Sequence, residues 1–155
     1  MNEQEKPETI VIDTNVFISA LLSAEGASRL IIRAGLEACY QPLMGVALLA
    51  EYEDIMHREA LFMNCPIDVV KRNELLDAFL SVCEWTNVYY LWRPNLRDEA
   101  DNHIIELAVA GNAKYIVTHN IRDFKNAQLL FPNLLIVKPE QLLTSGKLIH
   151  RLSNK

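Results

Sequence analysis

The sequence predicts an α/β protein in which helices cover both faces of a central, mainly parallel sheet, as a three-layer α/β/α sandwich. Several apolar runs are rich in Val and Ile and show no polar alternation, which is typical of strands buried on both faces. Segments with helical spacing separate these runs, and strands that alternate with helices favour parallel pairing. The chain has 155 residues, enough for a single domain with a sizeable core.

The first half of the chain should contain a buried strand, an extended segment and a series of helices. The strand is expected at 9–13, where "TIVID" is β-branched and continuous. Gly26 separates the first two helices, and Pro66 opens the last one. The helices are expected at 16–23, 27–38, 44–60 and 66–85, and the extended segment at 39–43.

The second half should supply the remaining strands and helices of the sandwich. "NVYYLW" is apolar enough for a strand, "KYIVT" and "LLIVK" are strongly β-branched, and Pro139 suits the first position of a helix. The strands are expected at 87–92, 114–118 and 134–138, and the helices at 98–111 and from 139 onward. We expect a flexible amino-terminal arm at 1–8, a single domain at 9–145 and a tail at 146–155.

Composition and charge narrow the class of protein. Half of the residues are apolar and 23% are charged, as in an ordinary globular domain. The sequence shows neither a membrane-spanning run nor a signal peptide, and its three scattered cysteines fit no disulfide or zinc pattern, so we expect a cytoplasmic protein with reduced thiols. The net charge of −5 argues against a general nucleic-acid coat protein but leaves room for an enzyme with an acidic, cation-binding pocket.

Polar residues stand where two of the buried strands end. Asp13 follows the first strand, with Thr14 and Asn15 behind it, and Thr118 to Asn120 follow a later strand. In parallel sheets of this kind, ligands bind beyond the carboxyl ends of the strands. A buried strand has little use for a carboxylate, so Asp13 either marks the end of the strand or is kept for chemistry.

Asp101 heads the core-facing stripe of a predicted helix. In "DNHIIELAVAGN" it shares the i, i+3, i+4, i+7 positions with Ile104, Ile105 and Ala108, while His103 points elsewhere. The alternative is ordinary chemistry of a helix start, with Asp98 as the N-cap.

Other acids are ambiguous when taken singly. Glu51 lies at the edge of an apolar helix face, where a solvated boundary charge is the default interpretation. Asp123 fits the capping of a short helix, and Asn120 fits a turn. Together with Asp13 and Asp101, however, they could line one cleft, where crowded carboxylates require a cation. Oxygen ligands select Mg²⁺ or Mn²⁺, and two such ions roughly 3.5–4 Å apart can drive phosphodiester hydrolysis.

In these segments the chain resembles the PIN domain, the ribonuclease fold of many toxins of toxin–antitoxin pairs. The resemblance is carried by "VIDTNVFISALL", "LLAEYEDIM", "RDEADNHIIELAVAGNAKYIVTHNIRDF" and "LLIVKPEQLL", which reach across most of the chain except about 60–90. It implies that Asp13, Glu51 and Asp101 bind Mg²⁺ or Mn²⁺, with Thr14 and Asn15 orienting their ligands. The fourth acidic position of the family is Asn120 here, and Asp123 is the candidate substitute.

The resemblance also implies an activity and partners. The expected reaction is metal-dependent hydrolysis of single-stranded RNA, in which Glu51 or Asp101 positions the attacking water and Thr118 supports the site. We further expect a cognate antitoxin protein and a homodimer. Basic residues in flanking loops could contact the RNA backbone, although each could equally be solvated charge: Arg93, Arg97, Arg122 and Lys125.

Two other functions stay open at this stage. A receiver-type phosphoacceptor domain would also place an acid after the first strand, Thr after a later one and Lys-Pro after the last, as Asp13, Thr118 and Lys138 do. A non-catalytic, RNA- or protein-binding protein of the PIN fold would fit the Asn at position 120 and the negative charge.

Overall fold

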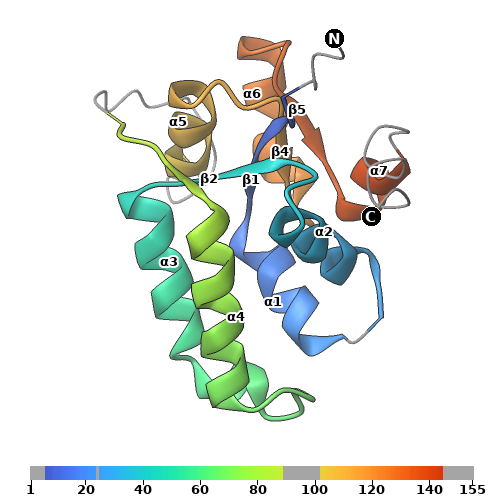
Figure 1. The fold of residues 1–155 in the computed structure, drawn as a ribbon. Coiled ribbons are helices and arrows are strands. Elements are labelled where there is room, and N and C mark those ends of the chain that lie inside the picture. The colour runs from blue at the N-terminus through green and yellow to red at the C-terminus, as the bar shows by residue number, and fades with distance from the viewer. Residues whose placement is uncertain (1–5, 24, 89–101, 145–155) are drawn as a thin grey trace, which may run out of the picture.

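The computed structural model of the protein describes residues 6–23, 25–88 and 102–144 (Figure 1). Its centre is a five-stranded sheet in the order β3-β2-β1-β4-β5, with every neighbouring pair parallel. The strands are β1 (Thr9–Ile12), β2 (Gln41–Met44), β3 (Glu84–Trp85), β4 (Tyr115–Val117) and β5 (Leu135–Val137). This arrangement confirms the predicted α/β class with a parallel central sheet.

Helices cover both faces of the sheet. They are α1 (Thr14–Leu22), α2 (Ala27–Leu36), α3 (Val46–Met56), α4 (Val69–Val82), α5 (Asn102–Ala110), α6 (Lys125–Leu130) and α7 (Pro139–Thr144), with short 3₁₀ helices η1 (Glu59–Phe62) and η3 (Ile121–Phe124). Figure 1 shows α5 and α6 on one side of the sheet and α1, α2 and α4 on the other. Right-handed crossovers explain this division, because the chain moves across the sheet in one direction from β1 to β3 and in the opposite direction from β4 to β5.

The core lies between the sheet and these helices. The central strands are almost completely buried, with Val11 and Ile116 side by side in the β1–β4 register and both inaccessible to solvent. Helix α5 packs on β1, β2 and β4. Its carboxyl end approaches β2 so closely that a Cβ at Gly111 would collide with Leu43, which explains the glycine at this position.

Helix α3 lies across the carboxyl edge of the sheet, where it contacts both α1 and α5. An aromatic cluster holds it there: the Tyr52 ring lies 5.4 Å from Phe17 of α1 and 6.1 Å from Phe79 of α4, measured between centroids. The buried Tyr52 hydroxyl also donates a hydrogen bond of 2.8 Å to the Ile12 carbonyl at the end of β1. The position of α3 relative to the end of β1 is therefore fixed by packing and by a directional bond.

Several predicted boundaries were wrong. The helix predicted at 66–85 ends at Val82, and Glu84–Trp85 form the edge strand β3, which pairs with Leu43 and Met44 of β2. The strand predicted at 87–92 is not observed at residues 87–88, and residues 89–92 lie outside the described ranges. The helix predicted at 44–60 ends at Met56, before η1.

Among the described residues, no single helix has the length and apolar composition needed to cross a membrane. Taken together, α1 and α2 meet that criterion of length and composition, but they are bent by 107° relative to each other.

Candidate functional site at the carboxyl edge of the sheet

Asp13 stands at the junction of β1 and α1. Its backbone N–H donates to the Val117 carbonyl of β4 at 3.0 Å, which continues the parallel ladder one residue beyond β1. Asp13 occupies the N-cap position of α1, but its side chain makes no capping hydrogen bond to that helix. The carboxylate instead faces the end of β4 and is only 6% exposed. A nearly buried carboxylate that does not cap its helix needs other partners.

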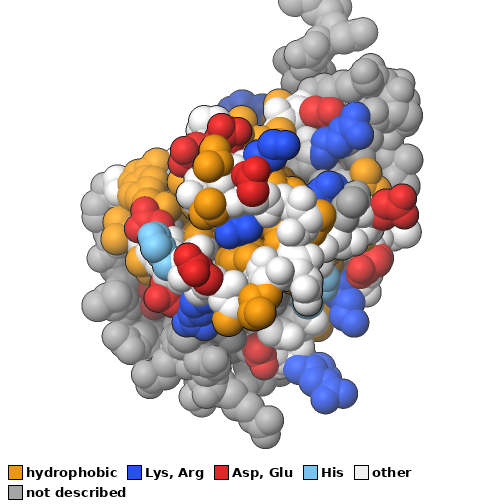
Figure 2. All heavy atoms as spheres, turned by 90° about the horizontal axis from the view of Figure 1, so that it is seen from below, with side chains coloured by type: hydrophobic (Ala, Val, Ile, Leu, Met, Phe, Trp, Pro, Cys, Tyr) orange, Lys and Arg blue, Asp and Glu red, His pale blue; other side chains and the backbone are white. Residues whose placement is uncertain are grey.

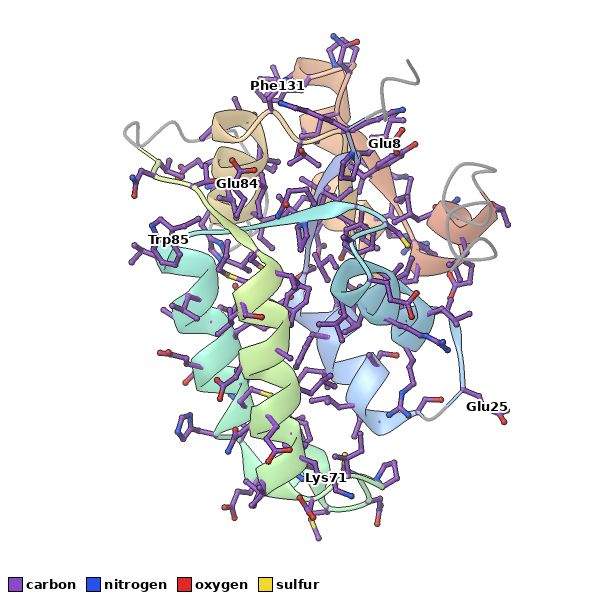
Figure 3. All side chains as sticks on the ribbon, viewed as in Figure 1. Glu8, Glu25, Lys71, Glu84, Trp85 and Phe131 are labelled. Carbon is purple, nitrogen blue, oxygen red and sulfur yellow. The ribbon has the colours of Figure 1, made fainter. Side chains whose placement is uncertain are left out.

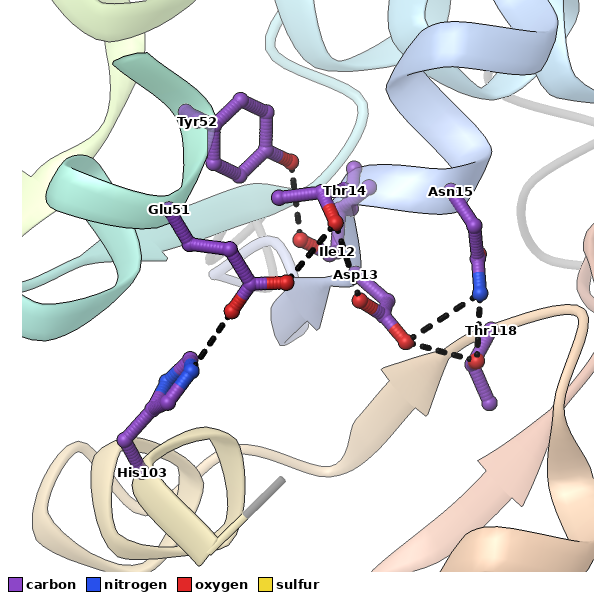
Figure 4. Close-up of polar contacts among 8 residues, drawn as sticks. All are labelled: Ile12, Asp13, Thr14, Asn15, Glu51, Tyr52, His103 and Thr118. Carbon is purple, nitrogen blue, oxygen red and sulfur yellow. Dashed lines mark hydrogen bonds and ion pairs between the residues drawn. The ribbon is translucent and has the colours of Figure 1, made fainter. Parts of the chain in front are cut away.

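Thr118 and Asn15 supply those partners (Figure 4). The fully buried Thr118 hydroxyl donates to Asp13 Oδ2 at 2.8 Å, and the Asn15 amide donates to the same oxygen at 3.3 Å. The Asn15 carbonyl oxygen accepts from the His119 backbone N–H, and the Thr118 hydroxyl accepts from the Asn120 backbone N–H. The ends of β1 and β4 are thereby joined by one polar network around Asp13.

Glu51 reaches the same edge from α3. The Thr14 hydroxyl lies 3.0 Å from Glu51 Oε1 and 3.4 Å from Asp13 Oδ1. A hydroxyl has a single hydrogen, so Thr14 serves the nearer Glu51 oxygen. His103 of α5 approaches the other Glu51 oxygen, with Nε2 2.6 Å from Oε2. Figure 4 shows the two carboxylates on either side of Thr14, contributed by different elements.

The environments of the two carboxylates shift their pKa values in opposite directions. Burial raises the pKa of Asp13; the hydrogen bond from Thr118 partly opposes this, and the nearby Glu51 charge adds to it. For Glu51, burial alone would raise the pKa, but the hydrogen bonds from His103 and Thr14 and the attraction of His103 outweigh it. The pKa of Glu51 is therefore below its usual value.

Not every candidate residue from the sequence joins this pair. Asp98, Asp101, Arg93 and Arg97 lie outside the described residues. Asp123 is partly exposed within η3, and no hydrogen bond among the described residues joins its carboxylate to Asp13. The Asn120 side chain is exposed, and only its backbone N–H enters the network.

The candidate RNA-binding residues of the described part lie close to the end of β4. Arg122 belongs to η3 and Lys125 begins α6, and both are exposed. On the face shown in Figure 2, acidic, basic and apolar side chains are interspersed rather than segregated by sign of charge. The position of Arg122 and Lys125 beyond the carboxyl end of β4 is compatible with contact to a ligand at this edge.

Two residues of the site were missed from the sequence. His103 falls outside the apolar stripe of its helix and was not chosen as a candidate residue, whereas it contacts Glu51 across the α3–α5 packing. Tyr52 was not among the candidate residues, although its hydroxyl donates to the Ile12 carbonyl at the end of β1. For His103 the available signal was its position two residues after Asp101 in the chain, and no pattern in the sequence indicated Glu51 as its partner.

The donor set of the site is suited to a hard divalent cation. Asp13 and Glu51 both offer carboxylate oxygens at one edge, and Mg²⁺ is usually bound by one or two carboxylates together with several waters. Among the described ranges, no group of three or more His, Cys, Asp or Glu side chains is arranged to hold a metal ion. A third protein ligand would therefore have to come from elsewhere, and Asp101 is the candidate that the sequence predicts.

The parallel sheet with acidic side chains at its carboxyl edge places this chain among α/β proteins that bind ligands at that edge. Comparison with known proteins identifies the family. The family model of the PIN domain matches residues 9–122, which is most of the chain. The chain therefore belongs to the PIN domain family, and the receiver alternative has no support from this match. No curated protein sequence matches the chain.

Comparison with solved structures agrees with the fold. The chain is similar to a chain in the crystal structure of VapBC2 from Rickettsia felis bound to a DNA fragment from their promoter. The two share 20% sequence identity and superpose with a TM-score of 0.57, over 84% of this chain and 98% of the other. At this identity the similarity establishes the fold.

Proposed function

We propose that this protein is a Mg²⁺- or Mn²⁺-dependent endoribonuclease that hydrolyses single-stranded RNA and acts as the toxin of a toxin–antitoxin pair. The observation that carries the proposal is the meeting of Asp13 and Glu51 at Thr14, on the edge where parallel α/β sheets bind ligands. Membership of the PIN domain family supports nuclease chemistry at this edge.

In this proposal the two carboxylates share the task of holding the cation. Asp13 and Glu51 would both bind it, and Asp101 would be the third ligand. When bound, a divalent cation acidifies a water molecule and stabilises the charge that develops on the phosphate oxygens. Thr118 and Asn15 fix the orientation of the Asp13 carboxylate, and His103 and Thr14 fix that of Glu51. Glu51 or Asp101 orients the attacking water toward the phosphorus.

Substrate contacts and the partner belong to the same proposal. Arg122 and Lys125, and with them Arg93 and Arg97, would contact RNA phosphates and position the strand without reading its sequence. Asp123 would take the place of the acid that the family has where Asn120 stands. The similarity to a chain of a VapBC complex supports a protein antitoxin as the partner of this chain. A homodimer stays a prediction.

The experiment measures cleavage of a labelled single-stranded RNA by the full chain with Mg²⁺, with Mn²⁺ and with EDTA. Asp13→Asn and Glu51→Gln should each lower the cleavage rate by at least about 100-fold, because each removes a charged group that acts on the transition state. Glu53→Gln is the matched control, since Glu53 lies on the same helix and is exposed. Its rate should stay unchanged.

The outcomes separate the proposal from its alternative. Cleavage that continues in EDTA, or that survives in folded Asp13→Asn protein, would show that the carboxylate pair does not support the reaction. RNA binding without cleavage under any metal condition would favour the non-catalytic binding protein, to which the exposed Asn120 points. Circular dichroism of each variant shows whether it is folded.

A further inference from the structure

A cavity of about 540 Å³ opens directly beside the site. It lies between the amino-terminal turn of α3, the segment that follows β3, and the first turns of α5. Its size falls within the range of pockets that bind small organic groups. Neither the acidic pair nor the proposed chemistry uses this space.

His103 connects the cavity to the carboxylate pair. Its ring lines the cavity, and its Nε2 lies 2.6 Å from Glu51 Oε2. A group bound in the cavity is thus separated from Glu51 by one imidazole ring. For a polymeric substrate whose scissile phosphate lies at Glu51 and Asp13, the cavity is within reach of a neighbouring unit.

The lining suits a flat, partly polar group. Val46 and Val88 are exposed lining residues and provide apolar surface, and Thr86 and Asn87 add hydrogen-bonding groups. A nucleobase combines an apolar face with hydrogen-bonding edges, and a lining of this kind suits both.

One hydrogen bond orients the polar end of the cavity. The indole N–H of Trp85 donates to Asn87 Oδ1 at 3.2 Å, and this bond does not use the Asn87 amide hydrogens. Trp85 itself pairs with Met44 through the β2–β3 ladder and lies beside the start of α3 (Figure 3). Its side chain is 51% exposed, which leaves an aromatic surface next to the cavity.

We propose that this cavity is a subsite for one nucleobase of single-stranded RNA, immediately next to the nucleotide whose phosphate is cleaved. This proposal rests on the proposed ribonuclease function and adds a specific contact to it. The base packs against Val46 and Val88, and Asn87 and Thr86 contact its edge. RNA that is paired cannot present a base in this way, so the subsite also accounts for a single-stranded substrate.

The test uses two changes: a Trp substitution that fills the cavity, and abasic positions that remove single bases from the RNA. Ala47 is an exposed lining residue of α3, so Ala47→Trp places a large ring in the cavity without disturbing the core. Ala78→Trp is the matched control, because Ala78 is an exposed residue in the middle of α4, outside the cavity. Binding of a labelled RNA of about 12 nucleotides is measured by anisotropy with Mg²⁺ in the Asp13→Asn background, so that the RNA stays intact.

Single abasic positions are then introduced along the same RNA. One abasic position should weaken binding about tenfold, the effect of losing one recognised base, and Ala47→Trp should weaken binding of intact RNA by a similar factor. The two changes together should be no worse than either alone, because both remove the same contact. Ala78→Trp should change nothing.

Each result decides the proposal. If the effects of Ala47→Trp and of every abasic position simply multiply, or if Ala47→Trp binds RNA normally, the subsite is wrong while the ribonuclease function stands on its own cleavage assay. If the wild-type chain neither cleaves nor binds single-stranded RNA, the ribonuclease function and the subsite both fail.

Discussion

The two carboxylates that meet at Thr14 are held in contrasting ways. Asp13 comes from the end of a central strand, is almost completely buried, and is tied to neighbouring strand ends through Thr118 and Asn15. Glu51 comes from a helix that lies across the sheet edge, and its side chain is 29% exposed and paired with His103. The strand side of the site is rigid and desolvated, and the helix side is more open.

Of the two carboxylates, only Asp13 lies in an environment that disfavours its ionised form. Burial raises the pKa of Asp13, so its ionised form is disfavoured within the fold, whereas the partners of Glu51 lower its pKa and favour its charge. Glu51 is thus accommodated as an anion by the protein alone. Asp13 gains most from a bound cation, as is typical of functional sites that tolerate local instability.

The largest loss of stability is expected on the strand side. Thr118→Val keeps the shape of the fully buried side chain but removes the donor to Asp13 Oδ2 and the acceptor for Asn15 and Asn120. The free energy of unfolding should fall by about 2–3 kcal/mol, the cost of leaving buried polar groups unpaired. Urea denaturation at neutral pH measures it, and Thr118→Ser, which keeps the hydroxyl, should lose clearly less.

The Thr118→Val effect should also depend on pH. The Thr118 hydroxyl favours the ionised form of Asp13, so the variant should raise the pKa of Asp13 further and lose least at acidic pH, where Asp13 is protonated. A destabilisation of the same size at acidic and neutral pH would show that Thr118 acts through packing alone.

Tyr52→Phe tests the hydrogen bond that connects α3, on the helix side of the site, to the end of β1 on the strand side. The variant removes the hydroxyl bond to the Ile12 carbonyl and should lower the free energy of unfolding by about 1 kcal/mol. Because this bond fixes α3 relative to β1, the cleavage rate should fall as well. Tyr40→Phe removes a comparable buried bond to the Ile31 carbonyl, away from the site, and should lower stability without changing the rate. Equal rates for the two variants would contradict the positioning role of Tyr52.

The strand side of the site was also the part that the sequence predicted well. A continuous β-branched run followed by Asp13, and a second run followed by Thr118, place two polar groups at the same edge whenever the strands are parallel neighbours. The alternation of strands and helices predicted that the strands are parallel, whereas the pairing of β1 with β4 is known only from the structure. Local patterns located each strand end because it is defined by its own sequence.

The helix side depended on packing between distant segments. The spacing of α3 put Glu51 at the margin of an apolar face, which is equally compatible with a solvated charge. Its contact with His103 exists only because α3 and α5 pack together, and no local pattern encodes that. The edge strand β3 was missed for a similar reason, since two residues gain strand geometry only by pairing with Met44 and Leu43.

On the helix side, His103→Ala should lower the free energy of unfolding by about 1 kcal/mol or less, because the pair is partly exposed. The pKa of Glu51 should rise toward its usual value, and the cleavage rate should fall through loss of carboxylate orientation. His57→Ala, on an exposed residue at the end of α3, is the control for both measurements. Carbon-detected NMR titration of Glu51 reports the shift directly, and an unmoved Glu51 pKa would refute the role of His103.

The smallest predicted change in the free energy of unfolding comes from neutralising each carboxylate. We expect this change to have opposite signs for Asp13 and for Glu51. Asp13→Asn removes a charge that the fold disfavours, and the amide oxygen of Asn can still accept from Thr118 while its NH₂ group faces the Thr14 hydroxyl. The variant should therefore be more stable than wild type at neutral pH by about 0.5 kcal/mol. Glu51→Gln removes a charge that the fold favours, so it should be less stable than wild type.

The stability of the Asp13→Asn and Glu51→Gln variants should depend on pH in opposite ways. The raised pKa of Asp13 means that its stabilising contribution is complete below its ordinary pKa and is lost as the pH rises through the folded value, so the advantage of Asp13→Asn should grow over that window. The lowered pKa of Glu51 means that its contribution is present above its ordinary pKa and is lost as the pH falls through the folded value. Denaturation of both variants and wild type between acidic and neutral pH in EDTA measures this, and two variants that shift stability in the same direction would show that the carboxylates are not divided in this way.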